Sequence, residues 1–521
     1  MNIVLAMVPL AVAFVMLALL QQSGARAGLA TLATAVALAL FVPGFHLALA
    51  QIALAATQGA ATSLTVLYVL FPALLLYQLQ RVSGNISVLA HATTRLCPDR
   101  QVRVLLLVLG LSPLIESVSG FGVGVVVVIP MLTALGIEAV QACVLGLLGQ
   151  LAVPWGGLAV GITLGANLTG LNANGLGAST ALVLAPVTVG FALAALAMSG
   201  GTAGLRHLWP AALIAGLVLF AGEWLFSQAP GVELAGVFAA IPTTVLLAIW
   251  GHAAARRTRQ SAITAGKQAA HADTTLPASS EGSVMDDNAP DARRMLQALL
   301  PYAVLIVGLL LSRLVPPFQL WLQELGVLTL PSIGLHFQFL YNPGFYLLLG
   351  ALTALLYLGP KAREFPTVLL RTLQQFTPGA VSIVSFLAAS QIMGASGMIA
   401  VLGNAAATLG GGYSWIAPWL GALGGWLTGS NAGSNAMFAR LQQETSIRAG
   451  LPVHWVMGAQ NGAASIATMI SPARMVLATS TTGIAGQEGQ LLRRVGPLVL
   501  AAVLLISLVL FGIVLAKLSA F

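Results

Sequence analysis

The chain has 521 residues, of which 58% are hydrophobic and only 7% are charged. Soluble proteins carry about 25% charged residues, so this composition excludes a soluble globular domain and predicts a protein that has lipid as its solvent. Transmembrane β-barrels alternate apolar and polar residues and are less hydrophobic overall. The remaining option is a set of helical spans, each of which satisfies its own backbone hydrogen bonds. The sequence therefore predicts an all-α polytopic membrane protein.

The formal net charge is +8, which in a soluble protein would suggest nucleic acid as a partner. Here the basic residues lie in short loops between apolar runs, as the positive-inside rule describes. We therefore expect membrane lipid and no nucleic acid as a partner, while the oligomeric state stays open. The two cysteines, Cys97 and Cys143, lack the spacing of a metal or redox site. Residues 2–20 have no preceding Lys or Arg, which favours a retained first span over a signal peptide.

Apolar runs close to the roughly 20 residues that cross a bilayer recur along the whole chain. They lie near residues 2–20, 27–43, 50–78, 104–135, 138–160, 178–198, 209–227, 234–250, 297–315, 343–359, 377–402, 413–428, 430–441, 453–470, 472–485 and 497–517. Several runs are too short, too long or too glycine-rich for a simple span. We therefore predict about 11–14 membrane crossings together with re-entrant hairpins and broken helices.

A polar segment, residues 251–296, divides the chain into halves of similar length, 1–250 and 297–521. It contains many charged residues with Ser, Thr and Pro and has no apolar run, which predicts a solvated cytoplasmic linker. Basic clusters at 81–103, 256–259, 361–371 and 493–494 are placed on the same cytoplasmic side.

Glycine-interrupted apolar segments occur in both halves. Ser117–Gly122 is followed roughly 35 residues later by Pro154–Gly157, and Met393–Met398 is followed at a similar distance by Gly424–Asn431. Paired interruptions of this kind in inverted repeats point to the binding site of a secondary transporter. Broken helices expose N–H groups and positively polarised helix N-termini, which suit a carboxylate. The alternative interpretation is glycine-mediated helix packing.

From this pairing we predict two inverted-repeat halves, each with a re-entrant hairpin. The first hairpin is expected near 112–130 and the second near 386–402, followed by a polar broken-helix region at 424–442.

Two ionisable residues lie inside apolar runs and are candidates for function. Glu116 has no other charged residue near it, so it is a candidate proton-binding group, or alternatively a structural cap of a hairpin helix. Arg474 follows Pro472 and could hold a carboxylate by two hydrogen bonds, or alternatively extend to the membrane interface. Glu138 and Glu223 are weaker candidates, because each is expected near the solvated end of a span.

Polar and glycine positions are dense between Thr428 and Asn435, more so than helix packing requires. No P-loop, nucleophile elbow or metalloprotease motif is present, and the histidines do not form pairs across spans that would ligate haem. We therefore expect a transporter and not an enzyme, with no cofactor other than a coupling ion.

Several blocks resemble the L-lactate permease family. Leu427–Gln442, with the sequence LTGSNAGSNAMFARLQ, is similar to a motif late in that family's chains. Met469–Pro472 and Gly483–Glu488 resemble the elements that follow it, and Glu116–Gly122 resembles an E-G-x-x-G-F-G element of the first half. The motifs are confined to these blocks, but length and span number agree along most of the chain.

This resemblance implies a plasma-membrane carrier that takes up L-lactate, and often glycolate, with protons. It adds support to Glu116 as a site residue, for which the apolar surroundings predict proton coupling. By position in the motifs and by the arguments above, the candidate substrate-binding residues are Ser119, Gly120, Phe121, Gly122, Thr428, Gly429, Ser430, Asn431, Ser434, Asn435, Ser471, Pro472 and Arg474.

The chain also departs from the family pattern. Val123–Val125 replaces a small residue followed by Pro-Val-Ala, Asn431 stands where relatives often carry Asp, and Arg474 stands where they often have a small polar residue. These departures favour anion binding but leave open another small carboxylate as substrate and sodium as coupling ion. A channel is disfavoured because the chain lacks the oligomeric selectivity rings of channels.

Overall fold

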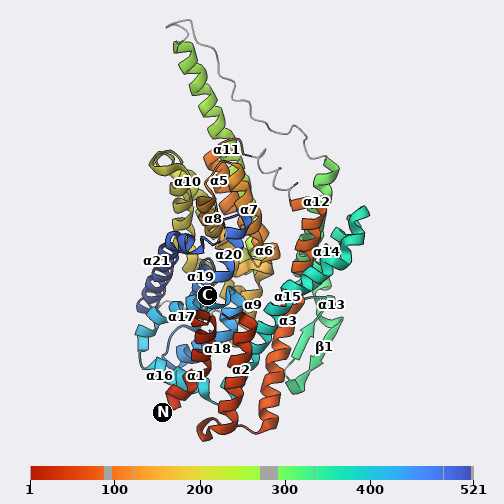
Figure 1. Cartoon of the computed structure of the whole chain (residues 1–521), viewed down its shortest axis with the longest axis vertical. Coiled ribbons are helices and arrows are strands. Elements are labelled where there is room, and N and C mark those ends of the chain that lie inside the picture. The colour runs from red at the N-terminus through yellow and green to blue at the C-terminus, as the bar shows by residue number, and fades with distance from the viewer. Residues whose placement is uncertain are drawn as a thin grey trace.

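The structure, a computed structural model, describes residues 2–20, 22–86, 88, 97–120, 122–269, 292–333, 335–484 and 486–517 (Figure 1). Within these residues, ten helices are long and apolar enough to cross a membrane, and shorter apolar helices accompany them. The strands found there are β1 (Val327–Leu330) and β2 (Leu335–Gln338), which form a small antiparallel hairpin. The prediction of an all-α polytopic membrane protein is confirmed.

The first group of helices belongs to the first half of the chain. They are α1 (Asn2–Phe14), α2 (Gly24–Phe41), α3 (Leu49–Ser83), α5 (Arg100–Leu105), α6 (Ser112–Ser119), α7 (Val123–Ala134), α8 (Ala139–Leu148), α9 (Gly156–Thr169), α10 (Ala173–Phe226) and α11 (Val232–Ala269). A π-helical turn, η3 (Leu106–Leu111), joins α5 to α6, and a 3-10 segment, η4 (Gln150–Trp155), precedes α9. Helix α10 bends sharply at Gly201, so it corresponds to two spans.

The second half has a similar number of helices. They are α12 (Ala292–Leu314), α13 (Pro316–Glu324), α14 (Pro343–Leu356), α15 (Phe365–Ala395), α16 (Met398–Ala407), α17 (Tyr413–Thr428), α18 (Asn431–Arg448), α19 (Val453–Thr468), α20 (Pro472–Thr481) and α21 (Glu488–Leu515).

A helical hairpin with its tip inside the protein forms from α5, η3 and α6 on one side and α7 on the other. Its tip contains Gly120 and Gly122, whose φ angles of 68° and 83° are costly for any residue but glycine. At its open end, the Arg100 guanidinium donates a hydrogen bond of 3.3 Å to the carbonyl oxygen of Gly136. The two arms therefore begin and end on the same side of the molecule.

A second hairpin enters from the opposite end and consists of α17 and α18. Its tip is at Gly429, which has a φ of 64°, and Ser430. At its open end, Arg448 donates to the amide oxygen of Asn404 on α16 at 2.6 Å. Figure 1 places α16 at the end of the molecule that lies away from α5. The two hairpins thus point toward each other.

Each hairpin is followed by a helix that breaks at the level of the tips. In the first half α8 stops before η4 and the chain resumes as α9, and in the second half α19 stops at Thr468 and the chain resumes as α20 at Pro472. The order of hairpin and broken helix therefore occurs twice, in opposite orientations. This is the arrangement that positions the site.

The counterpart of the first hairpin tip is not the segment that glycine spacing selects. The structure pairs that tip with Gly429 and Ser430, whereas Met393–Met398 comprises the end of a long span, Lys361–Ala395, a turn at Ser396 and Gly397, and the first residue of α16. There, Gly394 lies beside Arg440 of α18 rather than beside Glu116. The pairing of 393–398 with 117–122 is therefore wrong, because a glycine-rich turn that ends a full span has the same composition as a hairpin tip.

A second group of helices packs beside the hairpins and includes α3, α12, α14 and α15, seen on the right of Figure 1. Its helices approach closely through glycine: a Cβ on Gly59 of α3 would lie 2.5 Å from the Cα of Ala388 on α15. Small residues permit this backbone approach in membrane helices. The group forms a wall along which α9 and α18 lie.

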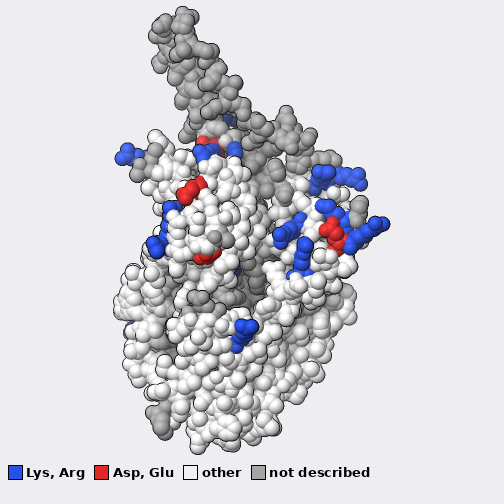
Figure 2. Space-filling model, viewed as in Figure 1, with Lys and Arg blue, Asp and Glu red and all other residues white. Residues whose placement is uncertain are grey.

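Basic clusters from both halves share one end of the molecule. The Lys361 ammonium donates to the carbonyl oxygen of Val82 at 2.8 Å, and Arg494 lies 3.8 Å from Glu138. Figure 2 shows that charged residues on the visible face gather toward this end. Helix α11 continues to Ala269 and α12 begins at Ala292, so residues 251–269 and 292–296 of the expected linker are helical, and residues 270–291 lie outside the described part of the chain.

Candidate functional site

A small cavity of about 40 Å³ lies where the two hairpin tips and the helix breaks meet. Both hairpins and both broken helices contribute to its lining. The residues around it are Glu116, Gly120, Val153, Gly156, Val160, Gly161, Gly429, Ser430, Asn431, Ala432 and Arg474. Segments that are far apart in the sequence therefore form one site, and that site contains both of the ionisable residues that lie inside apolar runs.

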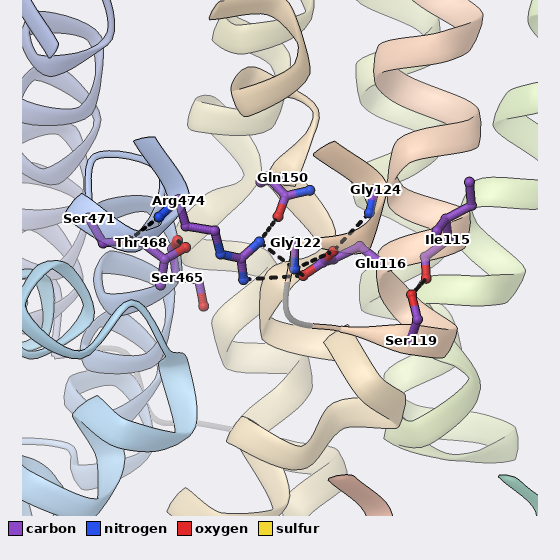
Figure 3. A network of polar contacts seen from close by, with 10 residues as sticks. All are labelled: Ile115, Glu116, Ser119, Gly122, Gly124, Gln150, Ser465, Thr468, Ser471 and Arg474. Atoms are coloured by element: carbon purple, nitrogen blue, oxygen red, sulfur yellow. Dashed lines mark hydrogen bonds and ion pairs between the residues drawn. The ribbon is translucent and has the colours of Figure 1, made fainter. Parts of the chain in front are cut away.

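The carboxylate of Glu116 is bound by the tip of its own hairpin. The Gly122 N–H donates to both carboxylate oxygens at 3.0 and 3.1 Å, and the Gly124 N–H donates to Oε2 at 3.3 Å (Figure 3). These donors are at the N-terminus of α7, where unpaired N–H groups and the helix dipole stabilise negative charge. The side chain is only 1% exposed. Glu116 therefore caps α7 and also faces the cavity.

Arg474 is the counter-ion of Glu116 and comes from the other half of the chain. Both of its terminal nitrogens lie 3.3 Å from Glu116 Oε1, and Nη1 also donates to the amide oxygen of Gln150 (Figure 3). Its side chain is 6% exposed. A buried charge that loses its partner is very costly, so each of these residues depends on the other. The pair links α6 in the first half to α20 in the second.

The second hairpin presents a helix N-terminus to the same cavity. Ser430 is the N-cap of α18, and its hydroxyl accepts a hydrogen bond from the Gly433 N–H at 3.2 Å. Ser471 caps α20 in the same way, by accepting from the Arg474 N–H at 3.3 Å. Helix N-termini attract anions, so the positive ends of α18 and α20 add to the charge of Arg474. The site as a whole suits a small carboxylate.

Beneath the first hairpin tip the backbone is strained. Gly157, Leu158 and Ala159 are consecutive residues with positive φ angles of 54°, 57° and 63°. A left-handed conformation costs a residue with a side chain about 1–2 kcal/mol. The turn packs directly against the tip, because a Cβ on Gly120 would lie 3.0 Å from the Gly157 nitrogen. Strain of this kind concentrates at functional sites.

Replacing Ala159 by Gly is expected to stabilise the protein by about 0.5–1 kcal/mol, because glycine adopts positive φ freely and this gain exceeds its extra entropy in the unfolded chain. Ala166→Gly is the matched control, since Ala166 lies in the regular part of the same helix and the change there should cost about 1 kcal/mol. The thermal unfolding of the purified variants in detergent measures both. A lower melting temperature for Ala159→Gly would contradict the assignment of strain.

Next to the cavity, buried amides form a hydrogen-bonded cluster. The Nδ2 groups of Asn431 and Asn435 both donate to Oδ1 of Asn461, at 2.8 and 2.9 Å. Asn435 Nδ2 also donates to the carbonyl oxygen of Gly161, and Asn461 Nδ2 donates to the hydroxyl of Thr180. The Oδ1 atoms of Asn431 and Asn435 have no hydrogen-bond partner within the described residues. Two buried oxygen acceptors are thus left free beside the site.

The other residues that the sequence selects lie around the cavity without lining it. Ser119 and Thr428 donate to carbonyl oxygens of their own helices, and Ser434 donates to the carbonyl oxygen of Gly421. Pro472 is exposed, whereas Ser471 packs against Gly429. These residues shape the hairpin tip and the helix ends. Phe121 lies outside the described residues.

Gln150 is a site residue that the sequence analysis does not select. It is a fully buried amide that contacts Arg474, and its Nε2 has no partner within the described residues. The available signal is an amide within the apolar run from Ala142 to Val153. The expectation for Glu223 is wrong: this residue is buried, not solvated, with 1% exposure and an unpaired Oε1.

Comparisons with known proteins agree with one another. The model of the L-lactate permease family matches residues 2–339 and 329–518. The chain is 27% identical to the glycolate permease GlcA of Escherichia coli K12 over 520 residues, covering 95% of this chain and 92% of the relative. It is 24% identical to an L-lactate permease of Bacillus subtilis 168 over 520 residues (94% and 91%), and 23% identical to one from Escherichia coli K12 over 457 residues (82% and 80%).

Proposed function

This chain belongs to the L-lactate permease family, a family of plasma-membrane transporters and not of enzymes, and we propose that it carries L-lactate and glycolate into the cell by symport with a proton. The multi-pass fold suits this activity, since ten helices of the described residues are able to span a membrane. Relatives over the full length are permeases for these acids. The substrate is thus a small 2-hydroxy monocarboxylate.

The observation that supports proton coupling is the buried pair of Glu116 and Arg474 on the cavity wall. The guanidinium has the Glu116 carboxylate as its partner, at 3.3 Å. A substrate carboxylate that binds Arg474 must therefore replace Glu116 as counter-ion. Glu116, once displaced, would be an unpaired negative charge in a buried site.

Charge balance in the site then favours one proton for each carboxylate. The ion pair of Glu116 and Arg474 is neutral as a unit, because its two charges cancel. A bound monocarboxylate would leave one excess negative charge, which is very costly away from water. A proton on Glu116 restores neutrality. Substrate and proton therefore bind together or leave together, which is the requirement for symport.

Alternating access requires the two hairpins to move relative to each other. The cavity of about 40 Å³ has little room, so the tips must separate for the substrate to enter. The hairpins open toward opposite ends, and the separation of either tip would expose the site to one side of the membrane. Rocking of one repeat against the other around a central site is the usual mechanism of such folds.

Uptake of radiolabelled L-lactate into proteoliposomes tests this proposal. With an inward proton gradient we expect saturable accumulation that a protonophore abolishes, and glycolate should compete with lactate. Replacement of external sodium by choline should leave the rate unchanged. Accumulation that ignores the proton gradient, or that neither acid supports, would reject the proposal.

Sodium coupling is the second candidate, and the free Oδ1 atoms of Asn431 and Asn435 favour it. Both atoms are buried, and Asn431 lines the cavity. Amide oxygens are suitable ligands for hard cations. In this case choline substitution would abolish uptake, and the variant Asn435→Ser would raise the sodium concentration needed for half-maximal rate. A panel of unlabelled carboxylates competed against lactate would identify a different small acid as the substrate.

A further inference from the structure

Val160 of α9 separates two cavities. On one side it lines the cavity that contains Glu116 and Arg474. On the other side it lines a smaller cavity of about 20 Å³, between α3, α9 and the beginning of α14, with Val66 and Asn342 in its wall. The Val160 side chain is 7% exposed. It is a lining residue of both cavities.

The first cavity has a polar part and an apolar part. Charge and hydrogen-bonding groups come from Glu116, Arg474 and the tip at Ser430, whereas Val153 and Val160 are the branched apolar side chains in the lining. A 2-hydroxy acid also has a polar end, formed by its carboxylate and hydroxyl, and one substituent on C2. If the carboxylate and hydroxyl of the acid contact the polar part of the cavity, its C2 substituent is directed toward Val153 and Val160.

We propose that Val160 sets the size of the C2 substituent that the transporter accepts, an inference that rests on the proposed function. Hydrogen in glycolate and methyl in lactate fit against an intact Val160. A longer substituent would collide with it, although the second cavity lies directly behind. Shortening Val160 removes the partition, and the second cavity then receives the additional carbon atoms.

The backbone that precedes Val160 forms a turn close to the first hairpin tip. Val160 follows the left-handed turn Gly157–Ala159, and its Cγ2 would lie 4.0 Å from a Cβ on Gly157. This turn packs against Gly120 at the first hairpin tip. Val160 therefore directly follows a backbone turn that lies against the first hairpin tip.

Proteoliposome uptake of glycolate, L-lactate, 2-hydroxybutyrate and 2-hydroxyvalerate tests the inference, because these acids share one polar end. Val160→Ala is expected to raise the ratio of 2-hydroxybutyrate to lactate uptake about tenfold, and Val160→Leu to lower the ratio of lactate to glycolate uptake about tenfold. These changes correspond to one methylene in an apolar pocket. The variants act in opposite directions, so either one that folds is informative.

Val66 supplies the matched control, since it lines only the second cavity. Val66→Ala should leave the substrate profile unchanged while Val160 is intact. Val66→Leu added to Val160→Ala should refill the space and restore the wild-type ratio. Wild-type profiles for both Val160 variants, or an equal effect of Val66→Ala alone, would overturn the inference. If the wild-type protein transports none of the four acids, the proposed function fails as well, and this outcome is distinct from an unchanged profile.

Discussion

Replacing Glu116 by Gln is expected to abolish proton-driven accumulation of substrate, by at least about tenfold, while exchange of internal for external substrate continues. The glutamine amide oxygen can still accept from the Gly122 and Gly124 N–H groups, so the hairpin tip keeps its cap. However, the neutral side chain can neither bind nor release a proton, and Arg474 then has only the substrate as counter-ion. Uptake with a proton gradient and exchange at uniform pH, in the same proteoliposomes, separate the two activities.

A second readout follows from the same charge argument. Because Arg474 is left without its carboxylate, L-lactate should raise the melting temperature of Glu116→Gln more than that of the wild type. Glu138→Gln is the control, since Glu138 has a side chain 61% exposed and lies 3.8 Å from Arg494 at the surface. Its coupling should equal that of the wild type. Proton-driven accumulation by Glu116→Gln at the wild-type level would exclude Glu116 as the coupling residue.

Replacing Arg474 by Met should have the largest effect of all. Binding of the substrate should weaken at least about a hundredfold, because a charged hydrogen-bonded contact inside a buried site is lost. The free energy of unfolding should also fall by about 3 kcal/mol, since Glu116 remains buried without a partner. Uptake kinetics and thermal unfolding in detergent measure the two effects separately.

The double variant Glu116→Gln, Arg474→Met distinguishes stability from function. It removes both charges, so most of the lost stability should return while transport stays absent. Arg448→Met serves as the control for losing an arginine, because its pair with Glu444 is 33–36% exposed and should contribute less than about 1 kcal/mol. A single Arg474 variant that transports normally would show that the guanidinium does not hold the carboxylate.

The composition and the apolar runs are sufficient to predict the fold class, because lipid leaves few alternatives to helices. Glu116 and Arg474 could also be selected as candidate site residues, since an ionisable residue inside an apolar run is rare and expensive. That they form a pair could not be predicted. They are separated by most of the chain, and only the packing of α20 against the first hairpin brings them within 3.3 Å.

Several other site residues could not be predicted from the sequence. Gln150 and Val160 are ordinary residues in apolar segments, and they belong to the site because Gln150 contacts Arg474 and Val160 lines the cavity. The left-handed conformation of Leu158 and Ala159 has no sequence signal, because neither residue favours it. The glycine spacing, by contrast, led to the wrong segment, Met393–Met398. Glycine indicates that the chain turns, but it does not distinguish the end of a full span from the tip of a hairpin.

The opposed orientation of the two hairpins bears on the direction of transport. The two hairpins open toward opposite sides, and both tips line the cavity that contains the pair of Glu116 and Arg474. A site that can be reached from either side allows transport in both directions, and a secondary carrier supplies no free energy of its own. For the proton symport proposed above, the sign of the net flux is set by the product of the acid and proton concentration ratios. A cell that produces the acid faster than it consumes it would use the same protein to release both acid and protons, and that efflux could sustain a proton-motive force.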